Sequence, residues 1–236
     1  MKMSIAIPTY ESKGRGNEFL EDLFRTIEIQ TFKDFEVVIS DHSIDNELLK
    51  VIYQYRGKFK IVYLKNEEQR GNGPANTNNA IENCSGEIIK VMFQDDFFYD
   101  DEALEKIYNA FDENTKWLLC ACNHTKNDGN SFYGDLYPAW NGDIINGVNT
   151  ISSPSVLAAR REVFDQVKFD PNLVMMMDCE FYYHAKERYG DPIYYHDVLV
   201  SNRVHEDQIS SMYLKEDYQK KFNGELLYCK EKHGVK

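Results

Sequence analysis

The sequence predicts a doubly wound α/β fold, with a mostly parallel central sheet and helices on both faces. Short apolar runs with many β-branched residues occur at 4–10, 35–40, 60–64 and 87–93. Helical patterns at 18–30, 46–55 and 75–83 separate these runs. Apolar runs without alternation are typical of parallel strands buried on both faces. Alternating strands and helices give right-handed crossovers between such strands.

The second half of the chain is less regular. We expect a helix at 102–111, a strand at 117–124, a helix at 178–189, a strand at 192–200 and a polar helix at 212–232. Gly, Asn, Asp and Pro crowd the segment 126–155, which favours loops with short antiparallel strands. With no repeat or linker to divide it, the chain is predicted to form one domain over residues 1–236.

The composition excludes several classes of protein. The net charge is −12, from 39 acidic and 27 basic residues, which disfavours nucleic acid as a ligand. An anionic small molecule would need a local cation or metal. No apolar run reaches the roughly 20 residues of a membrane span, so no integral membrane segment is expected. Five cysteines without a CxxC pair and the absence of a signal peptide indicate a cytoplasmic protein.

Polar residues gather where the predicted parallel strands end. Ligands bind at the carboxyl ends of the strands in sheets of this kind. Asp95 and Asp96 follow one apolar run directly, and two neighbouring carboxylates repel unless a cation is present. A divalent metal with oxygen ligands would remove that conflict, whereas the alternative is an ordinary acidic turn. Asp100 and Asp101 precede a helical pattern and are predicted to cap it.

Several motifs follow one another in the order found in a known family. They are "IAIPTY", "VVISDHSIDN", "RGNGPANTNNAIENCSGEIIKVMFQDD", "SPSVLAARREVF", "MMMDCEFYYHA" and "NRVHEDQIS". Together they cover most of residues 3–211, and the set resembles the inverting family-2 glycosyltransferases of the GT-A fold. The resemblance implies a Rossmann-like nucleotide-sugar-binding half at 1–112, a small antiparallel acceptor and catalytic half at 113–211, and a C-terminal helix at 212–236.

The resemblance also implies roles for residues that match the family's motifs. Asp41 would read the nucleotide base, and the diphosphate would be held with Mn²⁺ or Mg²⁺. The family's DxD motif is incomplete, because Phe93 occupies its first position. Asp96 and His205 would be metal ligands, although the division of roles between the two aspartates stays open. The donor-binding set is Pro8, Thr9, Tyr10, Asp41, Arg70, Gly71, Asn78, Asp95 and Arg203.

The family's general base points to Asp178 in this sequence. The residue before it is Met177, where the family often has Glu, and Glu180 lies roughly 200° further around the predicted helix. Asp178 is therefore preferred to Glu180, with a helix N-cap as its alternative role. Tyr137 and Trp140 lie where the family builds its acceptor site, and either sugar stacking or packing under a long loop would explain them.

These expectations define a metal-dependent inverting glycosyltransferase. It would move a sugar from a UDP-, GDP- or dTDP-linked donor to a hydroxyl of a glycan or related acceptor, as in polysaccharide biosynthesis. Two alternatives remain at this point: a nucleotidyltransferase, for which "YESKGRGNE" would be the phosphate loop, and a non-catalytic sugar-binding relative. The sequence determines neither the donor sugar and base, nor the acceptor, nor the oligomeric state.

Overall fold

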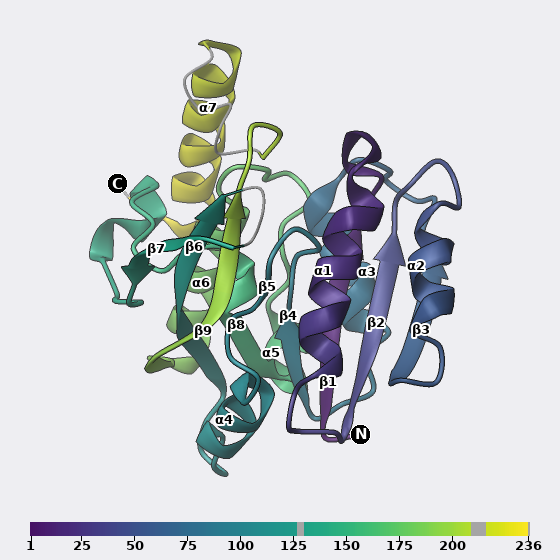
Figure 1. The fold of residues 1–236 in the computed structure, drawn as a ribbon. Helices are drawn as coiled ribbons and strands as arrows, with labels where there is room; N and C mark the ends of the chain where they lie inside the picture. Colours follow the sequence, from purple (N-terminus) through teal and green to yellow (C-terminus); the bar gives the residue numbers. More distant parts are fainter. Residues whose placement is uncertain (127–129, 209–215, 236) are drawn as a thin grey trace.

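The first half of the chain forms a four-stranded parallel sheet. The computed structural model describes residues 1–126, 130–208 and 216–235. The elements in order are β1 (Met3–Thr9), a 3₁₀ turn η1 (Ser12–Gly14), α1 (Gly16–Glu28), β2 (Phe35–Asp41), α2 (Leu48–Gln54), β3 (Lys60–Lys65), α3 (Gly73–Glu82) and β4 (Ile88–Val91). The strands pair in the order β3-β2-β1-β4, all parallel. Helix α1 covers one face of this sheet and α3 the other (Figure 1).

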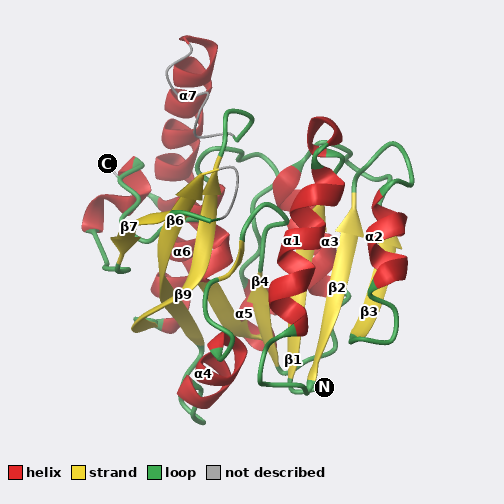
Figure 2. Ribbon diagram, in the orientation of Figure 1, coloured by secondary structure: helices red, strands yellow, loops and turns green. Residues whose placement is uncertain are grey.

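The second half continues the same sheet with antiparallel and parallel strands. It contains β5 (Phe97–Phe98), α4 (Ala103–Ala110), β6 (Trp117–Lys126), β7 (Phe132–Leu136), the 3₁₀ turns η2 (Gly142–Asn146) and η3 (Pro154–Val156), β8 (Leu157–Arg160), α5 (Arg161–Gln166), α6 (Met177–Tyr189), β9 (Ile193–Val204) and α7 (Glu216–His233). The described strands form one sheet in the order β3-β2-β1-β4-β8-β6-β9-β5, with β7 beside β6 (Figure 2). The predicted mixed α/β architecture is therefore confirmed.

Strand β8 joins the two halves. It pairs antiparallel with both β4 and β6, so the β4 and β6 strands run in the same direction on either side of it. The sequence did not indicate β8 or the short helix α5, because elements of four and six residues carry too little periodic signal. The predicted antiparallel pairing in the turn-rich segment is present as β7 against β6.

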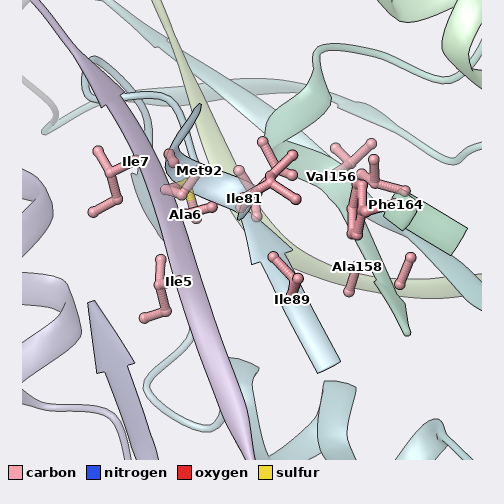
Figure 3. Packing of buried hydrophobic residues seen from close by; sticks show 14 of the residues in the cluster. Ile5, Ala6, Ile7, Ile81, Ile89, Met92, Val156, Ala158 and Phe164 are labelled. Atoms are coloured by element: carbon pink, nitrogen blue, oxygen red, sulfur yellow. The ribbon is translucent and has the colours of Figure 1, made fainter. Parts of the chain in front are cut away.

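The core lies on both faces of the sheet. Strands β1, β2 and β4 are buried at almost every position, as expected for strands covered on both sides. Ile5 and Ile7 of β1, Ile89 of β4, and Val156 and Phe164 beside β8 belong to one hydrophobic core cluster (Figure 3). This packing fixes the carboxyl ends of β1 and β4 relative to the second half of the chain.

Two local predictions are refined. Asp100 supports the start of α4, because its carboxylate accepts a hydrogen bond from the N–H of Glu102 at 2.7 Å, whereas Asp101 offers its backbone carbonyl to Thr31. The predicted C-terminal helix begins at 212, but residues 209–215 lie outside the described residues, as does the final Ser of "NRVHEDQIS". Within the described part of the chain, no helix combines the length and apolarity that a membrane crossing requires.

Candidate active site

Asp41 ends strand β2 as a fully buried carboxylate. It accepts hydrogen bonds from the Tyr63 hydroxyl at 2.7 Å, the Lys65 ammonium at 3.2 Å and the backbone N–H of Ser43 at 2.8 Å. These contacts tie the carboxyl ends of β2 and β3 together. The base-reading role of Asp41 stays a prediction, and it would require a nucleotide to compete with Tyr63 or Lys65.

An amide cluster crosses the carboxyl ends of β1, β2 and β3. Asn76, on α3, donates to the carbonyls of Thr9 at 3.1 Å and Ser40 at 2.9 Å, and its Oδ1 accepts from the Ser40 hydroxyl at 2.6 Å. Asn79 donates to the Ser40 hydroxyl at 2.7 Å. The predicted donor residue Asn78 points elsewhere, because both atoms of its amide bond to the backbone of Phe169, at 2.7 and 3.0 Å.

The end of β1 is held to the end of β4 by Gln94. Its amide accepts from the N–H of Tyr10 at 2.7 Å and donates to the Tyr10 carbonyl at 2.9 Å and the Ser12 hydroxyl at 2.6 Å. The Tyr10 side chain remains 47% exposed beside this clamp. Phe93, in the place of a carboxylate, packs against the hydrophobic core instead.

The acidic pair divides into one buried and one accessible carboxylate. Asp96 is 5% exposed, and its oxygens accept from the backbone N–H of Arg203 at 3.0 Å and the Ser153 hydroxyl at 3.4 Å. Burial, with Asp95 adding to it, raises the pKa of Asp96 to about 7. The Asp95 carboxylate lies 3.1 Å from Nε2 of His205. The geometry therefore pairs His205 with Asp95 rather than with Asp96.

These residues fit a metal that takes further ligands from a substrate. No cluster of three or more His, Cys, Asp or Glu side chains suited to a metal occurs in the described residues. Asp95 and His205 together provide one carboxylate oxygen and one imidazole nitrogen within contact of each other. A divalent ion bound by few protein groups completes its shell with substrate phosphates and water. The donor set suits such an ion.

The side chain of Arg203 makes structural contacts within the protein. Its guanidinium is buried, lies 5.1 and 5.4 Å from the ring centroids of Phe19 and Phe97, and pairs with Asp22 at 2.8 Å. Its Nε donates to the Asp95 carbonyl at 3.0 Å. These contacts occupy the Arg203 guanidinium, so the geometry does not support the predicted phosphate contact through Arg203.

Arg70 stays a predicted phosphate contact. It is exposed in the loop after β3, where Gly71 has a φ of +85°.

Asp178 lies in the first turn of α6, and its carboxylate is oriented from two sides. One oxygen accepts from the side-chain amide of Asn149 at 2.8 Å, and the other accepts from the N–H of Cys179 at 2.8 Å. Burial raises the pKa of Asp178 to about 6. The N-cap of α6 is Met176, so the alternative role of Asp178 as N-cap is wrong. Glu180 is fully buried and bonds to His233 instead.

Residues 149–153 connect Asp178 with Asp96. Asn149 bonds to Asp178 and also accepts from the N–H of Ser152 at 3.0 Å, and Ser153 bonds to Asp96. Ser152 has a φ of +115°, a strained value for a residue with a Cβ, and its hydroxyl accepts from Asn202 at 2.6 Å. Sequence reasoning missed all three residues: Asn149 lies outside the quoted motifs, and Ser153 and Asn202 begin two of them but were given no role.

The two predicted acceptor residues differ in their surroundings. Tyr137 is 52% exposed, with its ring 6.2 Å from that of His196. Trp140 stacks on Tyr183 of α6 at 6.4 Å, and the Lys186 ammonium lies 4.8 Å from its ring centroid. The Trp140 ring therefore packs against α6, which agrees with packing rather than sugar stacking as its role. The Tyr137 ring is exposed.

Known proteins resemble this chain in sequence and in fold. Residues 4–184 match the family profile described as Glycosyl transferase family 2. A poly(ribitol-phosphate) β-N-acetylglucosaminyltransferase, TarP, from Staphylococcus aureus is 34% identical over 125 residues, which cover 50% of this chain and 35% of TarP. The chain spans only 18% to 35% of the lengths of the first curated relatives that it matches.

Two solved structures superpose on most of the chain. S. aureus TarS 1–349 in complex with UDP-GlcNAc has a TM-score of 0.69 at 22% identity, covering 94% of this chain and 64% of TarS 1–349. The mannosyltransferase PcManGT from Pyrobaculum calidifontis, in complex with GDP-Man and Mn²⁺, has a TM-score of 0.64 at 15% identity, covering 93% and 59%. The profile spans most of the chain, the fold superposes on that of these glycosyltransferases, and the protein belongs to glycosyl transferase family 2, with the GT-A fold.

Proposed function

We propose that the protein is a metal-dependent inverting glycosyltransferase that transfers a sugar from a nucleoside-diphosphate sugar to a hydroxyl group. The observation that carries the proposal is the bonded path from Asp178 through residues 149–153 to Asp96. It joins a carboxylate of raised pKa to the acidic strand end of a GT-A fold. The complexes of TarS with UDP-GlcNAc and of PcManGT with GDP-Man support a nucleotide-sugar donor.

In this proposal Asp178 is the general base. The acceptor hydroxyl donates its proton to the free lone pairs of the ionised Asp178 carboxylate as its oxygen attacks the anomeric carbon. The attack comes from the side opposite the departing diphosphate, so the configuration inverts. The Asn149 amide and the Cys179 N–H hold the carboxylate in place during this step. A pKa of about 6 leaves Asp178 ionised and still basic at neutral pH.

Asp95 and His205 would hold the divalent ion, and the Mn²⁺ in the PcManGT complex supports the use of a divalent metal by this chain. The ion would supply positive charge to the leaving diphosphate. Asp96 is the buried partner that sets the direction of the strand end through its bonds to Arg203 and Ser153. Arg70 adds an exposed cation at the same edge of the sheet.

The acceptor is proposed to be a hydroxyl of a glycan or a polyol phosphate. TarP and TarS act on poly(ribitol phosphate), which supports a polyol acceptor for this chain as well. Tyr137 is the proposed acceptor-side ring, because it is exposed whereas Trp140 is packed. The five cysteines are free and buried, which supports a reducing compartment such as the cytoplasm.

A donor panel tests the proposal. The full chain is incubated with Mn²⁺, a polyol-phosphate or glycan acceptor, and UDP-, GDP- or dTDP-sugars, and released nucleoside diphosphate is measured. We expect release with one class of donor, dependent on acceptor and metal. Asp178→Asn should keep nucleotide affinity and lose turnover. Pyrophosphate formation from a nucleoside triphosphate and a sugar phosphate would contradict the proposal, and so would the absence of nucleotide binding.

A further inference from the structure

Helix α6, which carries Asp178, has no side-chain cap of its own. Its N-cap residue is Met176, which makes no capping hydrogen bond through its side chain. The first N–H groups of an α-helix have no partner within the helix, and a Ser, Thr, Asp or Asn at the N-cap usually accepts one of them. Within the first turn the Cys179 N–H bonds to the Asp178 carboxylate, whereas the N–H of Met176 and those of the two residues before it need an acceptor from elsewhere in the chain.

That acceptor is the carboxylate of Glu225, on helix α7. It lies within 3.1 Å of the backbone nitrogen of Val174, 2.8 Å of that of Met175 and 3.0 Å of that of Met176. Glu225 is 5% exposed, so these amide hydrogen bonds take the place of most of the water around its carboxylate. A carboxylate at this position also complements the positive end of the α6 dipole. One side chain, 49 residues away, thus closes the turn that leads into α6.

Further contacts fix α7 in place on the same face as Glu225. Tyr228 and Lys232 bond to the Asp170 carboxylate at 2.9 and 2.7 Å, one and two turns after Glu225. Lys232 and His233 pair with the buried Glu180 at 2.8 and 2.9 Å. Asp170 lies before the turn that Glu225 binds, and Glu180 lies after Asp178. Helix α7 therefore contacts the segment that carries the proposed base on both sides of Asp178. Figure 1 shows α7 beyond the end of the sheet at which β6 ends.

The Asp178 carboxylate is therefore oriented by two separate elements. The Asn149 amide reaches its oxygen from the 149–153 segment, whereas its backbone is set by the turn that Glu225 closes. Asp178 is only two residues beyond Met176, so a change in the direction of these N–H groups would displace its side chain. The match to family 2 ends at residue 184 and does not include α7.

We infer that Glu225 is a positioning residue for the general base, and that α7 is part of the machinery of turnover. This inference rests on the proposed role of Asp178. Because Glu225 acts through the α6 backbone and lies in the second half of the chain, its loss should lower kcat and leave donor binding intact. Asp95, His205 and Arg70 are held by other elements.

The experiment compares Glu225→Gln and Glu225→Ala with Glu231→Gln in the full chain. Glu231 is an exposed carboxylate on the same helix, so its variant has the same charge as Glu225→Gln. Nucleotide affinity and the fraction of competent protein are measured by calorimetry, and kcat and KM by diphosphate release. We expect unchanged affinity and donor KM, with kcat about tenfold lower in Glu225→Gln, lower again in Glu225→Ala, and unchanged in Glu231→Gln.

Different results separate the two proposals. Full turnover in Asp178→Asn would refute the role of the base and leave Glu225 without its proposed target. Loss of turnover in Asp178→Asn with a wild-type kcat in Glu225→Ala would refute only the positioning role. Equal loss of donor affinity and kcat in the Glu225 variants would also refute it, as a general structural effect. If neither Glu225 variant folds, hydrogen exchange on the wild-type chain decides: the amides of 174–176 should be as protected as those of α6, and rapid exchange there overturns the inference.

Discussion

Replacing Asn149 by alanine should move the acidic limb of the pH–rate profile to higher pH. The Asn149 amide donates to Asp178 over 2.8 Å and stabilises the ionised carboxylate. In the wild-type protein, burial raises the pKa of Asp178 to about 6. At pH 5 about one tenth of the protein would carry the ionised base, so kcat should be about tenfold below its plateau.

The size of the shift follows from the contact that is lost. A hydrogen bond to a charged group contributes about 1.5–3 kcal/mol, and 1.36 kcal/mol corresponds to one pH unit in a pKa. Asp178 is partly accessible and keeps its bond to the Cys179 N–H, so we take the low end and expect an increase of about one pH unit. At pH 6 the variant should then work about fivefold more slowly than wild type, with the same plateau above pH 8.

The assay is kcat from diphosphate release between pH 4.5 and 8.5, at saturating donor and acceptor. Nucleotide affinity is measured over the same range, because burial raises the pKa of Asp96 to about 7 and its titration would affect donor binding. Asn146→Ala is the matched control, since Asn146 bonds to Asp143 in the same region and not to Asp178. Asn149→Asp, which replaces the donor by a second carboxylate, should move the limb further than Asn149→Ala. An acidic limb at the same pH in wild type and Asn149→Ala would refute the assignment of that limb to Asp178.

Three further results are expected. Burial raises the pKa of Glu36, but its hydrogen bonds, the one from Lys60 first, lower it to about 2. Its contribution of about 3 kcal/mol is therefore present above pH 4.5 and lost as the pH falls towards 2. Urea unfolding at pH 3 and pH 6 should show about 2 kcal/mol of that loss in wild type and little of it in Glu36→Gln. The bond to Glu180 raises the pKa of His233, so its contribution is complete below pH 6.5 and is lost as the pH rises through the raised value. Thermal melts from pH 5.5 to 9 should show this loss in wild type and not in His233→Gln. Finally, Asp95→Asn should abolish the Mn²⁺ dependence of nucleotide binding measured by calorimetry, and an unchanged dependence would contradict the Asp95–His205 pair as the metal site.

The fold could be predicted because its signals are local and repeated. Each strand of β1 to β4 is an apolar run, and each helix between them has an apolar face, such as Phe19, Leu23 and Ile27 on α1. The order of these signals determines a parallel sheet, and the carboxyl ends of its strands then locate the site. Asp95 and Tyr10 were proposed in this way, whereas Asp178 was proposed from the resemblance of "MMMDCEFYYHA" to a family motif. Strand β8 was missed, since its place between β4 and β6 depends on pairing across more than 60 residues.

The contacts that assign roles within the site could not be predicted. Arg203 and Asn78 have the residue types that bind phosphates and nucleosides, yet tertiary contacts occupy both of them. The surroundings of Lys90 could not be predicted from its residue type either. A lysine within a strand is ordinarily expected at the surface, but this one is fully buried, and burial lowers its pKa to about 8.

Lys90 changes how the charge of the acidic pair is balanced. Its ammonium donates to the carbonyl of Val91 at 2.9 Å and to the carbonyl of Ser155, and among the residues that the structure describes no carboxylate bonds to it directly. Ser155 in turn accepts from the N–H of Phe93, at the position where the family has an aspartate. The end of the strand therefore has a buried cation, Lys90, and lacks the carboxylate that the family has at position 93. With one fewer acidic ligand and one buried ammonium, the site carries less negative charge than a complete DxD motif would. A metal held by Asp95 and His205 then depends more on the diphosphate for its remaining ligands. It follows that metal and donor should bind together, each weakly in the absence of the other.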